Sequence, residues 1–361
     1  MEKIWSKTKI GNMELPHRLA MAPMTRSRAQ EDGTPGELAA LYYAQRATMG
    51  LLITEGTQPS DDGQGYLWSP GIYTDKHING WKKVTDAVHE AGGYVYIQLM
   101  HAGRMSHPDN TPHHRQPVAP SAIAPSIEMF TATGMQDIPV PRELSQEDIQ
   151  TTIADFRKAA AAAIEAGADG VEIHGANGYL INQFFGENSN TRTDEYGGSI
   201  ENRARFAIEV AKAVVEEIGA ERTGFRISPG TPLGGIQDGE QGPKLYRYLA
   251  KELAQLDLVY LHVMHLGNEE LLQDIRSIWQ NPLLVNRAGR TLEDLSADLD
   301  RGLADLVPVG VWSLANPDLV ERVQQGAPLN EADPATFFGS GSKGYTDYPT
   351  LDELKSQEGQ H

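Results

Sequence analysis

The chain contains no cysteine, and that absence excludes several kinds of site. Without thiols it has no disulfide bond, no cysteine-ligated iron–sulfur cluster, no zinc ribbon and no thiolate nucleophile. It also lacks any run of about 18 apolar residues, so no segment is predicted to span a membrane. Residues 1–5 lack the apolar core of a secretory signal peptide, and we therefore expect a cytoplasmic protein.

Basic residues are scarce as well. The 31 Lys and Arg residues are outnumbered by 49 Asp and Glu residues, which gives a formal net charge of −18. An acidic surface repels polyanions, so neither nucleic acid nor an anionic membrane is an expected partner. A bound anion would need a local pocket of basic side chains or backbone amides. The acidic surface fits a monomer or a homodimer. The sequence does not indicate a metal site.

The chain does have enough apolar residues for a large core, and it has one repeating pattern. Short β-like runs alternate with helical segments. The runs are 19–23, 51–55, 94–99, 170–174, 224–228, 258–263, 282–286 and 305–310, and the helical segments are 36–49, 77–91, 146–166, 200–218, 243–256, 269–279, 292–302 and 317–325. Such units predict an α/β fold, a (β/α)8 TIM barrel. We expect one domain over 1–361, with 340–361 as a C-terminal tail.

A doubly wound open sheet is the alternative architecture. It would need a glycine-rich phosphate turn early in the chain, and none is present. The sequence GSGSKG at 339–344 fits G-x-G-x-x-G, but no strand precedes it and no helix follows it, so we interpret it as a turn. The helix at 146–166 has the clearest ends, because Ser145 is a candidate N-cap with Asp148 three residues on, and Gly167 follows.

Two connections are long, 100–145 after the third run and 175–199 after the fourth. In a TIM barrel the carboxyl ends of the strands and the loops after them build the active site. The fourth run ends in His174, and Asn177 and Tyr179 follow within the next loop. The small residues between them suggest a low wall, over which a flat ligand reaches all three side chains.

Other strand ends carry further candidates. Thr25, Gln98 and Arg226 suit a planar heterocycle edged with hydrogen-bonding groups, and Arg226 stays cationic and stabilises developing negative charge. The loops after the seventh and eighth strands are the usual phosphate site of this fold. Gly289, Gly310 and the basic Arg287 and Arg290 lie there.

The segments that carry these residues resemble the old yellow enzyme family of FMN-dependent ene-reductases. The matching segments are HRLAMAPMTR at 17–26, TEGT at 54–57, GWK at 80–82, HGANGYL at 174–180, NTRTDEYGGS at 190–199, ANPDL at 315–319 and GYTDYP at 344–349. They run in order along nearly the whole chain. The resemblance implies an enzyme with FMN across the mouth of the barrel and NADPH or NADH as hydride donor.

The resemblance also implies roles for single residues. The implied cofactor-binding residues are Pro23, Met24, Thr25, Gly56, Gln98, His174, Arg226, Gly289, Arg290, Gly310 and Val311. His174 and Asn177 would hold a carbonyl or nitro oxygen of an activated alkene, and Tyr179 would donate the proton. The substrate-contacting residues would be Tyr66, Met100 and Phe338.

At three positions the chain departs from the family. Met100 stands where many relatives have Trp, and Phe338 where many have Tyr. Val311 follows Gly310 where relatives often place the arginine that binds the FMN phosphate. We expect Arg290 to supply that cation, with Arg287 as the alternative.

Other functions stay open at this point. One is reduction of nitro compounds or nitrate esters, and another is flavin binding without ene-reductase turnover. A relation to the larger dienoyl-CoA reductases, which carry an iron–sulfur segment, conflicts with the absence of cysteine. We interpret His262 and His265 as packing or pocket-wall residues rather than metal ligands. His101, His107, His113 and His114 are interpreted as solvent-exposed or lid residues.

Overall fold

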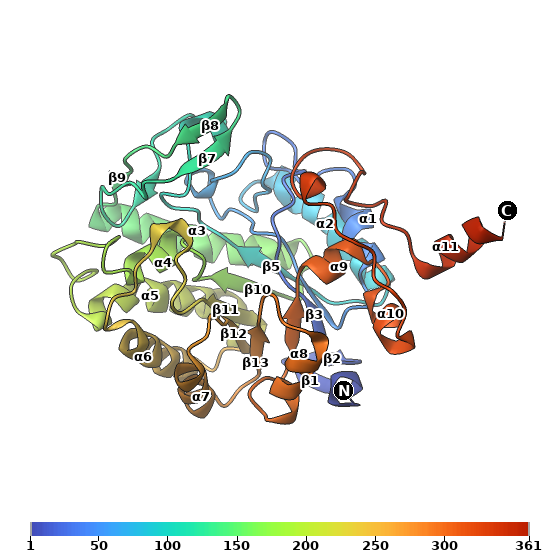
Figure 1. Ribbon diagram of the computed structural model, residues 1–361. Coiled ribbons are helices and arrows are strands. Elements are labelled where there is room, and N and C mark those ends of the chain that lie inside the picture. The colour runs from blue at the N-terminus through green and yellow to red at the C-terminus, as the bar shows by residue number, and fades with distance from the viewer. Residues whose placement is uncertain (1, 360–361) are drawn as a thin grey trace.

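Eight parallel strands form a barrel at the centre of the molecule, and helices surround it (Figure 1). The computed structural model describes residues 2–359. The barrel strands are β3 (Leu19–Met21), β4 (Leu51–Ile53), β5 (Val95–Leu99), β10 (Gly170–His174), β11 (Thr223–Ile227), β12 (Tyr260–Met264), β13 (Leu283–Asn286) and β14 (Val307–Val309). They pair in this order, β14 pairs with β3, and a bridge between Leu284 and Leu306 closes the ring. The predicted TIM barrel and its eight strands are confirmed.

Helices cover the outside of the barrel. Those that correspond to predicted segments are α1 (Ala39–Gln45), α2 (Asp75–Glu90), α3 (Gln146–Glu165), α5 (Ile200–Ile218), α6 (Gly242–Gln255), α7 (Glu269–Ile278), α8 (Leu292–Asp300) and α10 (Leu319–Gln325). Shorter ones are α4 (Leu180–Phe185), α9 (Val311–Ala315), α11 (Leu351–Glu358) and the 3-10 turns η1 (Glu2–Trp5), η2 (Asp61–Gly63), η3 (Pro108–Asn110), η4 (Ala220–Arg222), η5 (Leu233–Gly235) and η6 (Pro334–Thr336). The cap of α3 is as predicted, because Ser145 Oγ accepts the Asp148 N–H at 3.0 Å.

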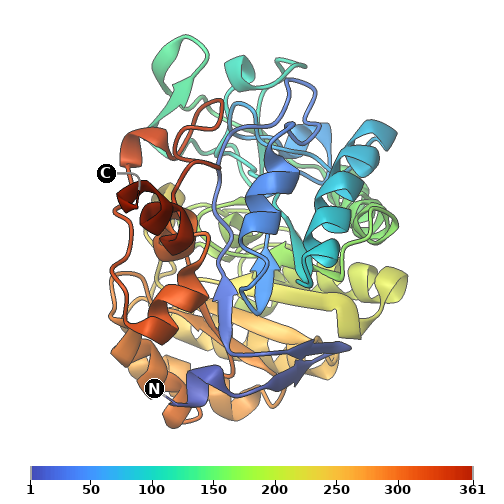
Figure 2. The same ribbon diagram turned by 90° about the vertical axis from the view of Figure 1, so that its right-hand side faces the viewer.

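A hairpin that the sequence did not predict closes the amino-terminal end of the barrel. It consists of β1 (Thr8–Ile10) and β2 (Met13–Leu15). Its side chains Ile10, Met13 and Leu15 are buried and pack against residues of the barrel strands in one hydrophobic cluster. Figure 2 shows this hairpin lying across the end of the barrel opposite to the long loops. The barrel is therefore plugged at one end and open at the other.

The predicted long loop after β5 has its own secondary structure. β6 (Val118–Ala119) pairs with β9 (Arg142–Glu143), and β7 (Glu128–Thr131) pairs with β8 (Gly134–Asp137) as an antiparallel hairpin. This β7–β8 hairpin projects at the top of Figure 1. Buried and exposed residues alternate along β7, so the hairpin has an inner face toward the barrel mouth and an outer face toward solvent.

The segment predicted as a C-terminal tail is in part packed against the barrel. Arg26 donates to the Gly344 carbonyl at 2.5 Å, and the Arg28 guanidinium lies 4.6 Å from the ring centre of the buried Tyr345. Only α11 extends away from the body of the molecule, at the right of Figure 1. Positions 360 and 361 of that tail lie outside the described residues. In the part of the chain from 2 to 359, no helix is long and apolar enough to cross a membrane.

Candidate active site

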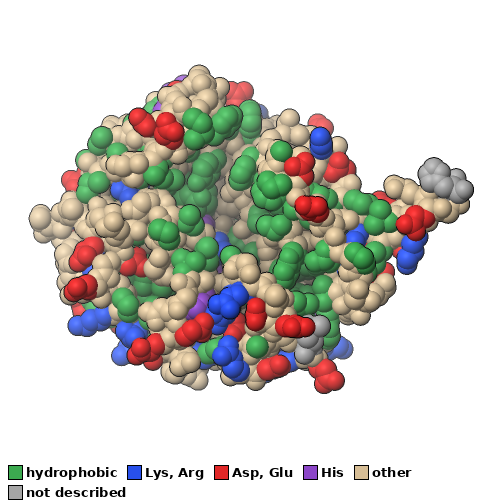
Figure 3. Space-filling model, viewed as in Figure 1, with side chains coloured by type: hydrophobic (Ala, Val, Ile, Leu, Met, Phe, Trp, Pro, Cys, Tyr) green, Lys and Arg blue, Asp and Glu red, His purple; other side chains and the backbone are tan. Residues whose placement is uncertain are grey.

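A cavity of about 540 Å³ lies at the carboxyl ends of the barrel strands. It is lined by the ends of β3, β11, β13 and β14 and the residues that follow them. Seven of the predicted cofactor-binding residues line it: Pro23, Met24, Arg226, Gly289, Arg290, Gly310 and Val311. The face of the molecule in Figure 3 is hollowed near its centre, with hydrophobic side chains above the hollow and Lys and Arg side chains below it. An apolar cavity with a few polar groups is the usual form of a cofactor site.

The other predicted cofactor residues stand at the ends of the neighbouring strands. Thr25 follows β3, Gly56 follows β4, and Gln98 and His174 lie at the ends of β5 and β10. A Cβ on Gly56 would lie 2.5 Å from the Met100 sulfur, so Gly56 leaves room for that side chain. Met100 is buried beside Gly56, whereas Phe338 is 62% exposed, and neither of the two is among the residues that line the cavity.

The turn after β10 sets the directions of His174, Asn177 and Tyr179. Asn177 has a φ of 59°, which asparagine tolerates better than most side chains. Its N–H donates to Ser228 Oγ at 2.8 Å, which ties the turn to β11. The small residues also allow close packing, because a Cβ on Gly175 would lie 2.4 Å from the Phe225 ring.

His174 is a neutral hydrogen-bond donor toward the site. Its Nδ1 accepts the Ala176 N–H at 3.2 Å, so the proton of the neutral ring is on Nε2. Burial, and then the positive charge of Arg226, hold the pKa of His174 well below its usual value of 6.5. The ring also packs edge-on against Tyr179, with ring centres 5.0 Å apart.

Tyr179 is paired with a second tyrosine. Its hydroxyl lies 2.8 Å from the Tyr66 hydroxyl, and either of the two can be the donor. Burial raises the pKa of Tyr179 well above 10, so the phenol is protonated at neutral pH. Both rings pack against the inner face of the β7–β8 hairpin and its flank, where Met129 and Ile138 are buried. The long loop after β5 therefore supports the tyrosine pair from outside.

Two buried polar atoms at this site have no hydrogen-bond partner among the described residues. Within residues 2–359, neither the buried Nε of Arg226 nor the buried Oδ1 of Asn177 forms a hydrogen bond. A buried polar group without a partner costs about 1–3 kcal/mol, so such groups usually await a ligand. Together with the apolar ends of β3 and β14, they fit a flat, polar-edged group such as a flavin ring.

Of the two candidate phosphate cations, only Arg290 is available. Arg287 is buried and donates to Asp298 at 2.6 Å and to Glu269 at 2.5 Å, so its charge is neutralised. Arg290 is exposed, lines the cavity, and forms no ion pair with another described residue. The exposed Val311, at the start of α9, also lines the cavity.

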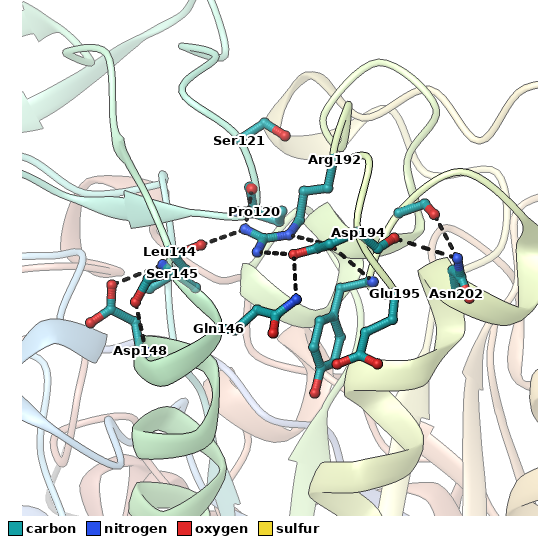
Figure 4. A network of polar contacts seen from close by, with 12 residues as sticks. Pro120, Ser121, Leu144, Ser145, Gln146, Asp148, Arg192, Asp194, Glu195 and Asn202 are labelled. Atoms are coloured by element: carbon teal, nitrogen blue, oxygen red, sulfur yellow. Dashed lines mark hydrogen bonds and ion pairs between the residues drawn. The ribbon is translucent and has the colours of Figure 1, made fainter.

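The sequence did not predict two polar groups that shape this region. Glu172, in the middle of β10, is fully buried and accepts hydrogen bonds from Gln98, Tyr260 and His262. Arg192 ties the two long loops together, since its guanidinium donates to Pro120 and Leu144 carbonyls and to Asp194 (Figure 4). The signal for Glu172 was a charged residue within an apolar run, which is unusual unless the charge is paired.

Some of the histidines in the loop after β5 are more buried than the sequence predicted. His101 and His107 are buried, at 2% and 9% exposed, so the solvent-exposed alternative is wrong for these two, and both lie in the long loop after β5. The His101 ring accepts the Gly103 N–H at 3.0 Å and holds the start of the loop after β5. His262 bonds to Glu172, and His265 contacts Arg287 at 3.0 Å.

Comparisons with known proteins agree with this site. The model of the NADH:flavin oxidoreductase / NADH oxidase family matches residues 3–330. The chain is 42% identical to a Leishmania infantum protein named "Probable flavin mononucleotide-dependent alkene reductase", over 95% of this chain and 96% of that protein. It is 40% identical to 12-oxophytodienoate reductase 2 of Arabidopsis thaliana, over 95% of this chain and 94% of that protein.

Solved structures are equally similar. Morphinone reductase in complex with tetrahydroNAD superimposes with a TM-score of 0.93 at 43% identity, over 97% of this chain and 98% of that chain. The old yellow enzyme homologue from Zymomonas mobilis gives a TM-score of 0.93 at 39% identity, over 97% of this chain and 100% of that chain. The chain therefore belongs to the NADH:flavin oxidoreductase / NADH oxidase family and to its old yellow enzymes, and it is an FMN-dependent oxidoreductase that uses NAD(P)H.

Proposed function

We propose that the chain reduces the C=C bond of α,β-unsaturated carbonyl or nitro compounds, with NADH or NADPH as the hydride donor. The carrying observation is the turn after β10, which brings together a neutral imidazole N–H, the side-chain amide of Asn177 and a protonated phenol. The names of two relatives, an alkene reductase and an oxophytodienoate reductase, support the same reaction class.

In this proposal the cofactor is held by the residues that line the cavity and the adjoining strand ends. Pro23, Met24, Thr25, Gly56, Gln98, His174 and Arg226 would hold the ring, and Gly289, Arg290, Gly310 and Val311 would hold the phosphate end. When bound, FMN would supply the hydride-transfer chemistry that links NAD(P)H to the β-carbon of the alkene. The Arg226 cation would stabilise negative charge on the bound ring.

His174 and Asn177 would bind the carbonyl or nitro oxygen of the substrate. Negative charge grows on that oxygen as the β-carbon is reduced. The His174 Nε2–H and the Nδ2–H group of the Asn177 side chain would donate hydrogen bonds to it. Because His174 is neutral at neutral pH, it binds the oxygen as a donor without a competing proton transfer. Removing one such donor typically costs about 3 kcal/mol, which is roughly a hundredfold in rate.

Tyr179 would donate a proton to the α-carbon. Its raised pKa keeps the hydroxyl protonated, and the 2.8 Å contact with Tyr66 gives it a partner that can return a proton afterwards. Tyr66, Met100 and Phe338 would contact the substrate. Met100 replaces a larger indole at the wall beside Gly56, which leaves a softer surface for the substrate.

The test separates the two half-reactions. The purified protein is reduced anaerobically with NADH and, separately, with NADPH, and is then mixed with enones, nitroalkenes, nitro compounds and nitrate esters. Flavin reoxidation by enones, with a saturated product, is the expected result. Reoxidation by nitrate esters alone would favour the nitro-type activity, and reduction without reoxidation by any of these acceptors would overturn the proposal.

A further inference from the structure

We propose that Glu172 is a positioning residue for the flavin, which fixes the orientation of the Gln98 amide and places a negative charge beneath the flavin site near Arg226. The inference rests on the proposed function, because it assigns Glu172 a task toward the bound cofactor. Glu172 does not touch the substrate in this view. It acts through Gln98 and through its charge.

The first argument is the convergence of donors on one carboxylate. Gln98 Nε2 donates to Glu172 Oε1 at 2.9 Å. The Tyr260 hydroxyl donates to Oε2 at 2.7 Å, and His262 Nδ1 lies 3.0 Å from the same oxygen. Both Glu172 and His262 are 0% exposed. Three donors from two other strands thus serve a single buried carboxylate.

The register of the barrel explains how these groups meet. Glu172 on β10 lies opposite Gln98 on β5 and opposite Gly224 on β11. A Cβ on Gly224 would lie 2.3 Å from the Tyr260 ring, so the glycine leaves the space through which Tyr260 reaches Glu172 from β12. In a strand, residues two apart share a face, so Glu172 lies on the same inner face as His174, one step deeper in the barrel.

The contact with Glu172 leaves Gln98 one orientation. An amide can present either its oxygen or its nitrogen, and a carboxylate accepts only from the nitrogen. Reversing the Gln98 amide would set its oxygen against Glu172 Oε1 at about the same 2.9 Å. The bonded orientation keeps Gln98 Oε1 as a free acceptor and leaves one amide N–H as a free donor, which matches the alternating edge of a flavin pyrimidine.

The carboxylate also sets the charge of the site. Burial by itself would raise the pKa of Glu172, but the charge and hydrogen bond of His262, the charge of Arg226 and the Tyr260 hydroxyl outweigh it and hold the pKa at about 2. Glu172 is therefore an anion, and it balances the buried Arg226 cation. A hydrophobic side chain would fill such a position at lower cost, so the buried charge calls for a reason beyond packing.

The alternative is that Glu172 only stabilises the barrel. The two roles differ in what a substitution changes. Glu172→Gln keeps the size of the side chain and an acceptor for Gln98 but removes the negative charge. The positive charge of Arg226 is then less compensated, so it would stabilise an anionic reduced flavin more strongly. Tyr260→Phe keeps the charge and removes one donor to it, which has the opposite electrostatic sign. Glu55→Gln is the matched control, because Glu55 is a second buried glutamate that bonds to Tyr43 outside this group.

The experiment measures three quantities on each FMN-loaded protein and its apoprotein: the two-electron reduction potential against a reference dye, the Kd for FMN, and the melting temperature of the apoprotein. For Glu172→Gln we expect the ratio of reduced to oxidised flavin at a fixed poise to rise at least tenfold, which is about 30 mV for a two-electron couple. For Tyr260→Phe we expect a smaller shift in the other direction, and for Glu55→Gln no shift.

Unchanged potentials in both Glu172→Gln and Tyr260→Phe, with only a lower melting temperature, would overturn the inference and leave the proposed function standing. If Glu172→Gln did not fold, the sign of the shift in Tyr260→Phe would decide. A wild-type protein that bound no FMN would overturn the proposed function itself, and this inference with it.

Discussion

The hydroxyl groups of Tyr66 and Tyr179 lie 2.8 Å apart, so a substitution at either residue affects the other. We expect Tyr179→Phe to lower the rate of alkene reduction by about 10²-fold or more, the usual contribution of a positioned general acid. Flavin reduction by NAD(P)H needs no such proton and should survive. Stopped-flow measurement of the two half-reactions checks this, with Tyr66→Phe as the control that keeps the acid and removes its partner. Equal losses in both half-reactions would contradict the assignment.

Arg290 is the second residue with a specific prediction. Since Arg287 is held by Glu269 and Asp298, Arg290 is left to bind the cofactor phosphate. We expect Arg290→Ala to weaken FMN binding about tenfold, because a hydrogen bond to a charged group contributes about 1.5 kcal/mol or more. The Kd should also become less sensitive to salt. Arg301→Ala, which removes a 58% exposed arginine paired with Asp298, is the control. An unchanged Kd in Arg290→Ala would exclude the role.

At the residue scale, the sequence was informative where side chains follow a strand end. His174, Asn177 and Tyr179 were predicted together because one short segment carries them. Glu172 was not given a role, because its partners Gln98, Tyr260 and His262 come from other strands and only the register brings them to it. The neutralisation of Arg287 depends likewise on Glu269 and Asp298, which lie on the neighbouring helices α7 and α8 and meet Arg287 only in the folded barrel.

The β7–β8 hairpin is the element whose role can be tested most directly. Ile138, at its flank, is buried in the cluster with Tyr66 and Tyr179, whereas Phe130 is on the outer face and 64% exposed. We expect Ile138→Ala to loosen the tyrosine pair, lowering kcat for alkene reduction severalfold while flavin reduction is unchanged. Phe130→Ala should leave both half-reactions as they are. A greater effect of Phe130→Ala than of Ile138→Ala would reverse the assignment of the two faces.

The elements themselves were unequally predictable. The long helices α3 and α5 were found almost to the residue. Ser145 caps α3 as predicted, and the structure shows that Ser199 caps α5 in the same way, each accepting an N–H group three residues on. The strands inside the loop after β5 were missed. They are two to four residues long, too short for the β-propensity of their residues to identify them. They are held by pairing with each other within a loop that Arg192 ties at its base.

At the scale of the whole molecule, the barrel was predictable because its unit repeats eight times, so an error at one unit does not change the fold. The β1–β2 hairpin was not. The sequence around Ile10, Met13 and Leu15 has no pattern that distinguishes a hairpin covering the end of a barrel from a strand at the surface. Their burial is favourable only because the amino-terminal end of the barrel would otherwise be open.

The stability of the whole molecule should depend on pH through its buried histidines. Burial lowers the pKa of His101 from 6.5 to about 4. Between pH 6.5 and pH 4 the unfolded chain therefore binds a proton at His101 that the folded chain does not bind. The contribution of the neutral His101 to the free energy of unfolding is complete above pH 6.5 and is lost as the pH falls toward 4. Between pH 8 and pH 5 it amounts to about 2 kcal/mol. The raised pKa of Asp155, about 6, acts in the opposite direction, so the comparison must be between variants.

We therefore expect His101→Asn, whose amide oxygen can still accept the Gly103 N–H, to lose less stability than the wild-type protein on going from pH 8 to pH 5. Denaturant unfolding at the two pH values measures the difference. His114→Asn is the matched control, because His114 is exposed and its φ of 55° is one that asparagine tolerates. The same pH dependence in all three proteins would mean that His101 is protonated in the folded state, and its ring would then need an acceptor that its present contact with Gly103 does not supply.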